Sequence, residues 1–366
     1  MSTLIEYAEY LGLNEIKVPC LSGVPEGQGV DVCVFINLLI KGVFITMAEI
    51  ICEGLRDGEL EIIQNMKDQM FDDATNIVSI THMPGGLTNR NFKVELDNGT
   101  KYAFRIAGEG TAEYLNRPCE HDAVAKAQIV GTSPEFYWYD ESTGSNICRF
   151  VEGDTMHEPD FNNRPEVMEH AAALVRKIHT SGLKLSYVFD PFAERVGYYE
   201  YLKENNWTRF YEELEELDKV YAKIEKSFRD KPYPLVSCHN DCLAANFIYD
   251  VPNDKMEVID WEYCGMNYYF FDLAAVISEN DMDPEMEEVA IRAYFGGEPT
   301  EMQRAEVLIG KFLMDGLWIP WALVQSVTKV DERDDYWDWG YVRVRRCQNH
   351  MANPNWDKYL DMILNR

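Results

Sequence analysis

Two short segments constrain the fold of this chain more than any other feature. The first, LVSCHNDCLAANFIYD, contains His239, Asp241 and, five residues after that aspartate, Asn246. The second, MEVIDWEY, places Asp260 at the end of an apolar run typical of a buried strand. Phosphoryl transfer uses these residue types, because one carboxylate orients the attacking hydroxyl while a second carboxylate and an amide oxygen hold Mg²⁺ against a triphosphate. A structural turn capped by Asn and Asp would explain His-x-Asp alone, but not the whole pattern.

HNDCLAANF together with IDWEY resembles the choline/ethanolamine kinase branch of the aminoglycoside-phosphotransferase-like kinases, over about residues 75–350. The resemblance implies an α+β, protein-kinase-like two-lobe fold, with a small antiparallel β lobe that has one helix and a large, mainly helical lobe. It also implies ATP and Mg²⁺ as cofactors, with Asp241 as the catalytic base and Asn246 and Asp260 as metal ligands. His239 in such a loop is expected to brace the backbone rather than carry a proton.

The pattern along the chain predicts three parts. Residues 1–70 form an N-terminal extension of unknown role, residues 71–152 an ATP-binding lobe, and residues 153–366 a catalytic and substrate-binding lobe. Within the extension, the spacing of apolar residues predicts a helix over residues 43–70. The apolar stretch over residues 32–52 is interrupted by charges, and a membrane-spanning helix needs about 20 mostly apolar residues, so no membrane insertion is expected.

Turn and periodicity patterns predict the elements of the two lobes. Asn98-Gly99, between two β-rich runs, indicates a hairpin. One helix is predicted over residues 118–130 and a single long one over residues 335–363. Asp272 follows the metal segment at the start of a helix, and it is expected both to cap that helix and to brace the catalytic loop by hydrogen bonds.

The glycine turn PGGLTNRNFKV lies between two predicted strands. A glycine turn lets backbone N–H groups approach phosphate closely, although Pro-Gly-Gly is also an ordinary hairpin turn. Its position upstream of the catalytic loop favours the first interpretation. The residues expected to cover the ATP phosphates are Gly85, Gly86, Thr88 and Asn89.

A basic residue on the strand KYAFRIAG is expected to pair with the α- and β-phosphates. The resemblance favours Arg105, with Lys101 and Lys93 as competing candidates. Glu120, in the next helix, either aligns Arg105 or serves as a negative charge near a helix N-terminus.

The segment CRFVEGDTM, residues 148–156, follows the last strand of the predicted small lobe. Its place in chain order predicts the linker between lobes, whose backbone would hydrogen-bond the adenine. Phe150 and Val151 would then line the base pocket.

Aromatic residues near the C-terminus indicate the acceptor. A quaternary ammonium has no hydrogen-bond donor, so its recognition requires aromatic faces and nearby carboxylates. Trp318 and Trp321 lie three apart on one predicted helical face, as in the tryptophan helix of the family that the chain resembles. The residues expected to bind substrate are Tyr263, Glu279, Trp318, Trp321, Trp339 and Tyr341. For Trp337 and Trp339, a place at the pocket edge and simple packing are both open. Aromatic residues at helical spacing are, in the alternative interpretation, core residues.

Composition excludes some partners. The net charge of −29 argues against nucleic acid and is compatible with a cationic substrate, although it also serves solubility. Nine scattered cysteines without a CxxC pair favour reduced thiols in a cytoplasmic protein, and the polar N-terminus shows no secretory signal. A homodimer is left open.

These features predict a kinase that phosphorylates the hydroxyl of choline to give phosphocholine. Ethanolamine, another amino-alcohol or an aminoglycoside is the alternative acceptor within the same chemistry. A nucleotide-binding pseudokinase scaffold is the alternative of a different class, and the complete set of Asp241, Asn246 and Asp260 argues against it.

Overall fold

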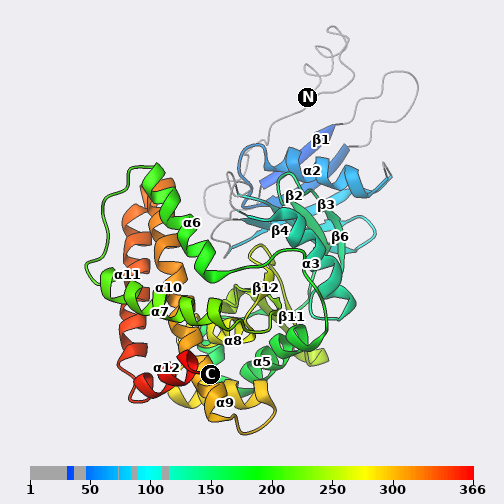
Figure 1. The fold of residues 1–366 in the computed structure, drawn as a ribbon. Helices are drawn as coiled ribbons and strands as arrows, with labels where there is room; N and C mark the ends of the chain where they lie inside the picture. The colour runs from blue at the N-terminus through cyan, green and yellow to red at the C-terminus, as the bar shows by residue number, and fades with distance from the viewer. Residues whose placement is uncertain (1–30, 37–46, 73, 85–88, 109–114) are drawn as a thin grey trace. The chain divides into compact units, whose positions relative to one another are not determined.

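The structure is a computed structural model that describes residues 31–36, 47–72, 74–84, 89–108 and 115–366. The chain divides into two compact units. Unit 1 comprises Met1–Arg117 and Pro134–Val151, and unit 2 comprises Pro118–Ser133 and Glu152–Arg366. Figure 1 shows that the first is built mainly of strands and the second mainly of helices.

Unit 1 contains a seven-stranded sheet in the order β1-β2-β3-β4-β5-β7-β6. The strands are β1 (Asp31–Ile36), β2 (Met47–Glu53), β3 (Ile77–Met83), β4 (Arg90–Leu96), β5 (Lys101–Ile106), β6 (Phe136–Tyr139) and β7 (Asn146–Arg149). Asn98-Gly99 turns β4 into β5 as predicted, and Gly99 has a φ of 80°, which glycine adopts without strain. Phe92 and Phe104 face each other across this pair and are buried in the core of the unit.

Residues 47–53 form a strand, so the prediction of a helix over residues 43–70 is wrong for its first part. Ile50 and Cys52 are buried while Ile51 between them is 53% exposed, which is the alternation of a strand. Gly54 and Gly58, both with positive φ, separate this strand from helix α2 (Glu59–Met70).

The strands of the predicted small lobe, residues 71–152, pair antiparallel as expected, and the sheet of unit 1 continues into β2 of the predicted extension. β2 and β3 pair in parallel, and α2 is the crossover helix that such a pair requires. The helix predicted for this lobe, α3 (Arg117–Ile129), instead has nearly all of its residues in unit 2.

Unit 2 consists of one long buried helix, shorter helices and two small sheets (Figure 1). Besides α3, its helices are α4 (Glu158–Asn163), α5 (Pro165–Thr180), α6 (Pro191–Glu204), α7 (Leu214–Asp230), α8 (Tyr269–Ser278), α9 (Pro284–Phe295), α10 (Glu301–Thr328), α11 (Arg333–Met351) and α12 (Trp356–Leu364). The strands are β8 (Asp154–Thr155), β9 (Val236–Cys238), β10 (Phe247–Asp250), β11 (Lys255–Val258) and β12 (Gly265–Asn267).

Helix α10 forms the centre of unit 2. Its side chains from Ala305 to Ser326 are buried, and α6, α8, α11 and α12 pack on it. Within the described residues it is the one helix long and apolar enough to cross a membrane, and 94% of its most apolar 18-residue window is buried inside the protein. Such burial is expected of a core helix.

The C-terminal region contains two helices where one was predicted over residues 335–363. α11 ends at Met351 and α12 begins at Trp356. Pro354 lies in the break, and proline lacks the N–H that a continuing helix would use.

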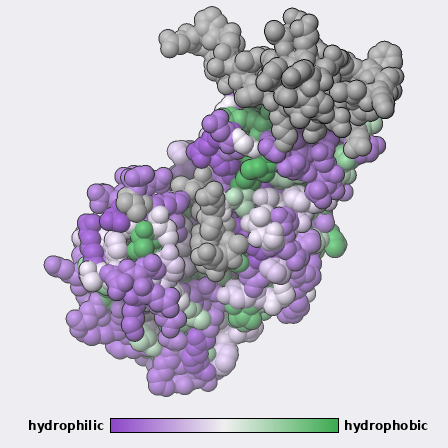
Figure 2. Space-filling view, turned by 90° about the horizontal axis from the view of Figure 1, so that it is seen from above, coloured by the Kyte–Doolittle hydropathy of each residue, from purple (hydrophilic) through white to green (hydrophobic). Residues whose placement is uncertain are grey.

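One face of the molecule is mainly hydrophilic where the structure describes it (Figure 2). Figure 2 shows hydrophilic side chains over most of one face, with hydrophobic ones in small separate patches. Val188 and Val196 are each 52% exposed, and scattered exposure of single apolar side chains is ordinary.

Candidate active site

One buried carboxylate, Asp272 of α8, holds the loop that follows β9. Its Oδ2 accepts a hydrogen bond from the N–H of His239, and its Oδ1 accepts one from the N–H of Asn240, each at 2.7 Å. His179 Nε2 lies 3.1 Å from the same carboxylate. The predicted bracing role of Asp272 is therefore confirmed. The predicted capping role is wrong, because the N-cap of α8 is Tyr268 and Asp272 lies within the first turn.

His239 connects the two motif segments. Its ring Nε2 lies 2.9 Å from the carbonyl oxygen of Ile259, to which it donates as the neutral tautomer. Burial lowers the pKa of His239, so the ring stays neutral at physiological pH. These contacts agree with a bracing role.

The loop and the strand beside it bring Asp241, Asn246 and Asp260 together. The side-chain N–H₂ of Asn246 donates to the backbone carbonyl of Asp241 at 2.9 Å and to its carboxylate at 3.0 Å. The backbone N–H of Ile259 donates to the carbonyl of Asn246 at 2.9 Å. Asp260 follows β11 with a φ of 63°, which aspartate tolerates better than most residues. Since the amide nitrogen of Asn246 is engaged by Asp241, its amide oxygen is the atom that could serve a metal.

The electrostatics of this cluster favour a bound cation. Burial raises the pKa of Asp241 well above its usual value, and the negative charges of Asp260, Glu279 and Glu262 raise it further. The hydrogen bond from Asn246 acts in the opposite direction. Hard oxygen donors that repel one another when charged are a donor set that fits Mg²⁺, whose charge would offset the repulsion.

Four aromatic side chains from three segments form what we call the aromatic cluster: Tyr263, Trp318, Trp321 and Trp339. The ring centroids of Tyr263 and Trp318 lie 5.1 Å apart, and those of Trp318 and Trp321 lie 5.7 Å apart, each pair edge to face. Trp321 contacts Trp339 of α11 at 5.4 Å, and its Nε1–H donates to the hydroxyl of Tyr263 at 3.0 Å. The structure thus gathers four of the residues predicted to bind substrate.

The aromatic cluster is tied to the catalytic loop through Asn240. The side-chain N–H₂ of Asn240 donates to the carbonyl of Tyr263 at 2.9 Å. Asn240 also contributes one of the two backbone donors held by Asp272. The loop that carries Asp241 and the aromatic residue Tyr263 are therefore one hydrogen-bonded assembly.

Glu279, also predicted to bind substrate, is engaged by an arginine that sequence reasoning missed. Arg343 Nη1 lies 2.7 Å from Glu279 Oε1, and Nη2 contacts the second carboxylate oxygen. The guanidinium also donates to Asp315 at 3.1 Å and lies over the ring of Trp339, 4.1 Å from its centroid. The one hint in the sequence was spacing, because Trp339 and Arg343 are four apart on a predicted helix.

Tyr341 is a predicted substrate residue that the structure places away from the aromatic cluster. Its side chain is 39% exposed, its hydroxyl donates to Glu213 at 3.1 Å, and its ring lies 5.7 Å from that of Tyr211. Trp337 packs against the same Tyr211, at 4.2 Å between ring centroids. Residues two apart on a helix point to different sides, which separates both from Trp339.

Of the glycine-turn residues predicted to bind nucleotide phosphates, only Asn89 lies within the described part of the chain. Gly85, Gly86 and Thr88 lie outside the described residues. Asn89 is buried, and its amide oxygen accepts a hydrogen bond from the N–H of Gly108 at 3.3 Å. The role of this loop stays a prediction.

Arg105 of β5 is buried and anchored within unit 1. Its guanidinium donates to the carbonyl of Gly144 from Nη2 at 2.7 Å and from Nε at 3.3 Å. The competing Lys93 lies on β4 with its Nζ 5.8 Å from the ring centroid of Phe150. Pairing of Arg105 with phosphates stays a prediction.

The remaining nucleotide-site candidates lie on both units. Phe150 is half-buried and Val151 is buried at the end of unit 1. Glu120 is buried on α3, within unit 2. Their contacts with nucleotide, and that of Glu120 with Arg105, stay predictions.

Comparisons with known proteins place the chain in a family and a fold. The sequence profile of the choline/ethanolamine kinase family matches residues 80–299, more than half of the chain. A solved choline/ethanolamine kinase family protein from Mesorhizobium loti is 31% identical, with a TM-score of 0.68 over 78% of this chain and 92% of that one. Choline kinase LicA from Streptococcus pneumoniae is 25% identical, with a TM-score of 0.66 over 80% and 98%. A LicA structure in complex with AMP is 26% identical, with a TM-score of 0.65 over 80% and 97%. These likenesses confirm the predicted two-lobe, protein-kinase-like fold.

Proposed function

Because this chain belongs to the choline/ethanolamine kinase family, and is therefore a small-molecule kinase, we propose that it transfers the γ-phosphoryl group of ATP to the hydroxyl of choline. The products would be phosphocholine and ADP. The observation that carries the choice of choline is the aromatic cluster of Tyr263, Trp318, Trp321 and Trp339, joined to the catalytic loop. A trimethylammonium group binds to aromatic faces within a negative field, and this end of unit 2 supplies both.

In the proposed reaction, Asp241 accepts a hydrogen bond from the choline hydroxyl and orients it for in-line attack on the γ-phosphorus. Asn246 holds the Asp241 carboxylate at 3.0 Å, and the Asp272 carboxylate fixes the backbone of the loop. Positioning of this kind supplies most of the acceleration in phosphoryl transfer, since little covalent chemistry falls to the protein. Asn246 and Asp260 would hold Mg²⁺, which neutralises charge on the triphosphate when bound.

The nucleotide assignments of the proposal come from the family resemblance. Gly85, Gly86, Thr88 and Asn89 would cover the phosphates. Arg105 would pair with the α- and β-phosphates, with Glu120 as its acidic partner. Phe150 and Val151 would line the adenine pocket. The burial of Arg105 supports a fixed guanidinium there.

Ethanolamine is the second candidate acceptor, since the family includes ethanolamine kinases. A primary ammonium carries N–H donors that require hydrogen-bond acceptors. Glu279 is the acidic residue predicted to face the ammonium, and Arg343 engages both of its oxygens. This engagement favours choline, because a quaternary ammonium needs no acceptor.

A substrate panel tests the proposal. ADP release would be measured with choline, ethanolamine, an aminoglycoside and no acceptor, each over a range of concentrations. We expect the highest kcat/KM with choline. A higher kcat/KM with ethanolamine would replace choline as the acceptor, and ATP consumption that no acceptor stimulates would favour the pseudokinase alternative.

A further inference from the structure

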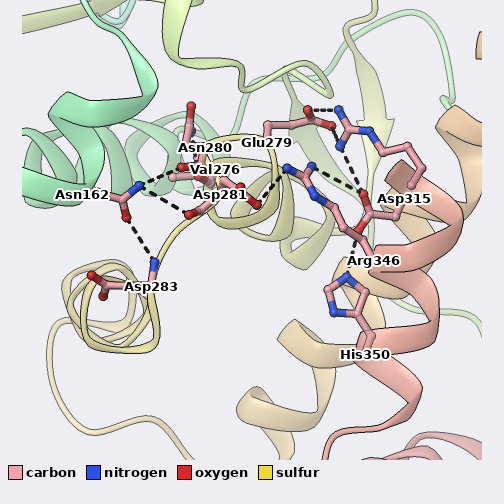
Figure 3. Close-up of polar contacts among 10 residues, drawn as sticks. Asn162, Val276, Glu279, Asn280, Asp281, Asp283, Asp315, Arg346 and His350 are labelled. Carbon is pink, nitrogen blue, oxygen red and sulfur yellow. Dashed lines mark hydrogen bonds and ion pairs between the residues drawn. The ribbon is translucent and has the colours of Figure 1, made fainter. Parts of the chain in front are cut away.

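One face of α11 carries three basic side chains that reach into unit 2. Arg343, Arg346 and His350 are spaced by three and four residues, so they lie along one side of the helix. His350 Nε2 lies 2.7 Å from the fully buried Asp315 of α10, and Arg346 pairs with Asp281 at 2.9 Å (Figure 3). Figure 3 also shows Glu279 beside the Asp315 end of this network.

Arg343 is the most buried member of this face, with 3% of its surface exposed. It pairs with both oxygens of Glu279 at the end of α8 and donates to Asp315 at 3.1 Å. A charge buried this deeply requires such partners, and the fork geometry of a guanidinium matches a carboxylate through two bonds. The pairing therefore fixes the orientation of Glu279.

The same guanidinium also contacts the aromatic cluster. Its Cζ lies 4.1 Å from the centroid of Trp339, which contacts Trp321 at 5.4 Å. Arg343 thus touches an acidic residue and an aromatic residue that were both predicted to contact the substrate ammonium. Arg343 therefore links Glu279 and Trp339 directly.

The segment that carries Glu279 is also held from two other directions. Asn162 of α4 donates to the carbonyl of Asn280 at 3.2 Å, and its side-chain oxygen accepts from the N–H of Asp283 at 3.1 Å (Figure 3). The side chain of Asn280 donates to the carbonyl of Cys242, next to Asp241, at 3.4 Å. These hydrogen bonds fix the backbone next to Glu279. The position of the Glu279 carboxylate then depends on Arg343.

We propose that Arg343 is a positioning residue that sets the preference of this pocket for a quaternary over a primary ammonium, an inference that rests on the proposed function. With both oxygens of Glu279 held by the guanidinium, the pocket offers aromatic faces and a diffuse negative field. That environment suits a trimethylammonium group. A primary ammonium must lose its water without gaining strong acceptors, which disfavours it.

The test compares the ratio of kcat/KM for choline to kcat/KM for ethanolamine in the wild-type protein, Arg343→Lys and Arg343→Met. Lysine keeps the charge but cannot pair with both oxygens at once, and methionine frees both. We expect the ratio to fall in the order wild type, lysine, methionine, by about tenfold overall, the scale of a hydrogen bond to a charged group. The KM for ATP should stay unchanged, because the change concerns the acceptor.

Arg345→Met is the control, since it removes an exposed arginine of the same helix that pairs with Gln348 at 3.0 Å. Its ratio should equal that of the wild type. A merely structural role for Arg343 would lower activity with both acceptors equally and leave the ratio unchanged, which would overturn the inference. Should the methionine variant fail to fold, the lysine variant carries the comparison.

The two proposals fail in different ways. A wild-type enzyme that prefers ethanolamine overturns both the choline assignment and the role of Arg343. A wild-type enzyme that prefers choline, with the same ratio in the Arg343 variants, overturns the inference alone.

Discussion

The catalytic loop and the aromatic cluster are built by different means. Asp272 holds the loop through two backbone N–H groups, and a positive φ at Asn240 and at Asp260 sets the path of the chain. The aromatic cluster is held instead by side chains from α10, α11 and the segment after Asp260, which meet through ring contacts and the bond from Trp321 to Tyr263. A substitution that disturbs a geometry set by the backbone is expected to abolish it. A substitution in a packed cluster removes only some of its contacts. The chemistry of the reaction should therefore respond sharply to mutation and the choice of acceptor gradually.

The largest effect is expected from Asp241→Asn in the catalytic loop. We expect kcat to fall about a thousandfold, because the oriented proton acceptor is lost. ATP binding should change little, since the proposed metal ligands are Asn246 and Asp260. Steady-state rates and nucleotide binding by calorimetry check the two parts.

Asp230→Asn is the control for this substitution, because Asp230 lies on the surface of α7 and pairs with Lys226. It should have wild-type kcat. An Asp241→Asn variant that loses ATP binding as strongly as turnover would contradict the assignment of Asp241 as the base.

The next largest effect is expected from Asp272→Asn. An asparagine side chain has one acceptor oxygen for the backbone N–H groups of His239 and Asn240, and its own N–H₂ would meet a donor. We expect a loss of about 2 kcal/mol in the free energy of unfolding, the scale of a hydrogen bond to a charged group, together with a lower kcat. Chemical denaturation and steady-state kinetics measure both.

Asp283→Asn is a matched control for that loss. Asp283 caps α9, and its carboxylate likewise accepts from two backbone N–H groups, those of Glu285 and Met286. It lies at a helix N-terminus, where asparagine caps nearly as well as aspartate, so little stability should be lost. Equal losses in the two variants would show that Asp272 has no special bracing role.

The catalytic loop could be predicted from the sequence because its chemistry is local. Asp241 and Asn246 lie within one turn-like segment, and Asp260 follows the β10–β11 pair. Residue type and spacing were therefore enough to predict that the three residues lie together. Trp318 and Trp321 were predictable for the same reason, since a separation of three places them on one face of any helix.

Long-range partners could not be predicted in this way. Glu279 and Arg343 are 64 residues apart, and RVRR on a polar helix is more typical of a solvated face than of a buried ion pair. Tyr341 lies outside the aromatic cluster because residues two apart on a helix point to different sides, even though Tyr341 is close to Trp339 in sequence.

The strand at 47–53 depends on a similar non-local contact. Ile50 and Ile51 fit a helical or a strand pattern equally, and pairing of β2 with β3 selects the strand. The pairing of β2 with β3 forms only after α2 has crossed over between them. The local pattern in residues 43–70 does not predict that pairing.

A moderate effect is expected from Trp321→Leu in the aromatic cluster. The substitution removes the aromatic face and the donor to Tyr263, so the KM for choline should rise about tenfold while kcat and the KM for ATP change less. Trp337→Leu is the matched control, because this tryptophan packs on Tyr211 away from the cluster. Similar KM values for choline in the two variants would contradict a cage role for Trp321.

The smallest expected effect is on the stability of the Asp241→Asn variant. This substitution should lower kcat but raise the free energy of unfolding. Burial and neighbouring carboxylates raise the folded-state pKa of Asp241 above its usual value of 3.8, so the folded protein holds this proton more tightly than the unfolded chain. The stabilising contribution of the group is complete below pH 3.8 and is lost as the pH rises through the raised pKa. At neutral pH the charged carboxylate therefore destabilises the metal-free protein.

Asp241→Asn should consequently stabilise the metal-free protein at pH 7.5 by about 1 kcal/mol, a rise of about 2 °C in Tm. The gain should shrink as the pH falls toward 4, where the wild-type carboxyl is protonated, and also in saturating Mg²⁺ and ATP, which offset the repulsion in the wild type. Thermal unfolding at several pH values measures this. A variant that is less stable than the wild type at pH 7.5 would mean that the Asp241 carboxylate contributes to the structure of the loop as well as to its chemistry.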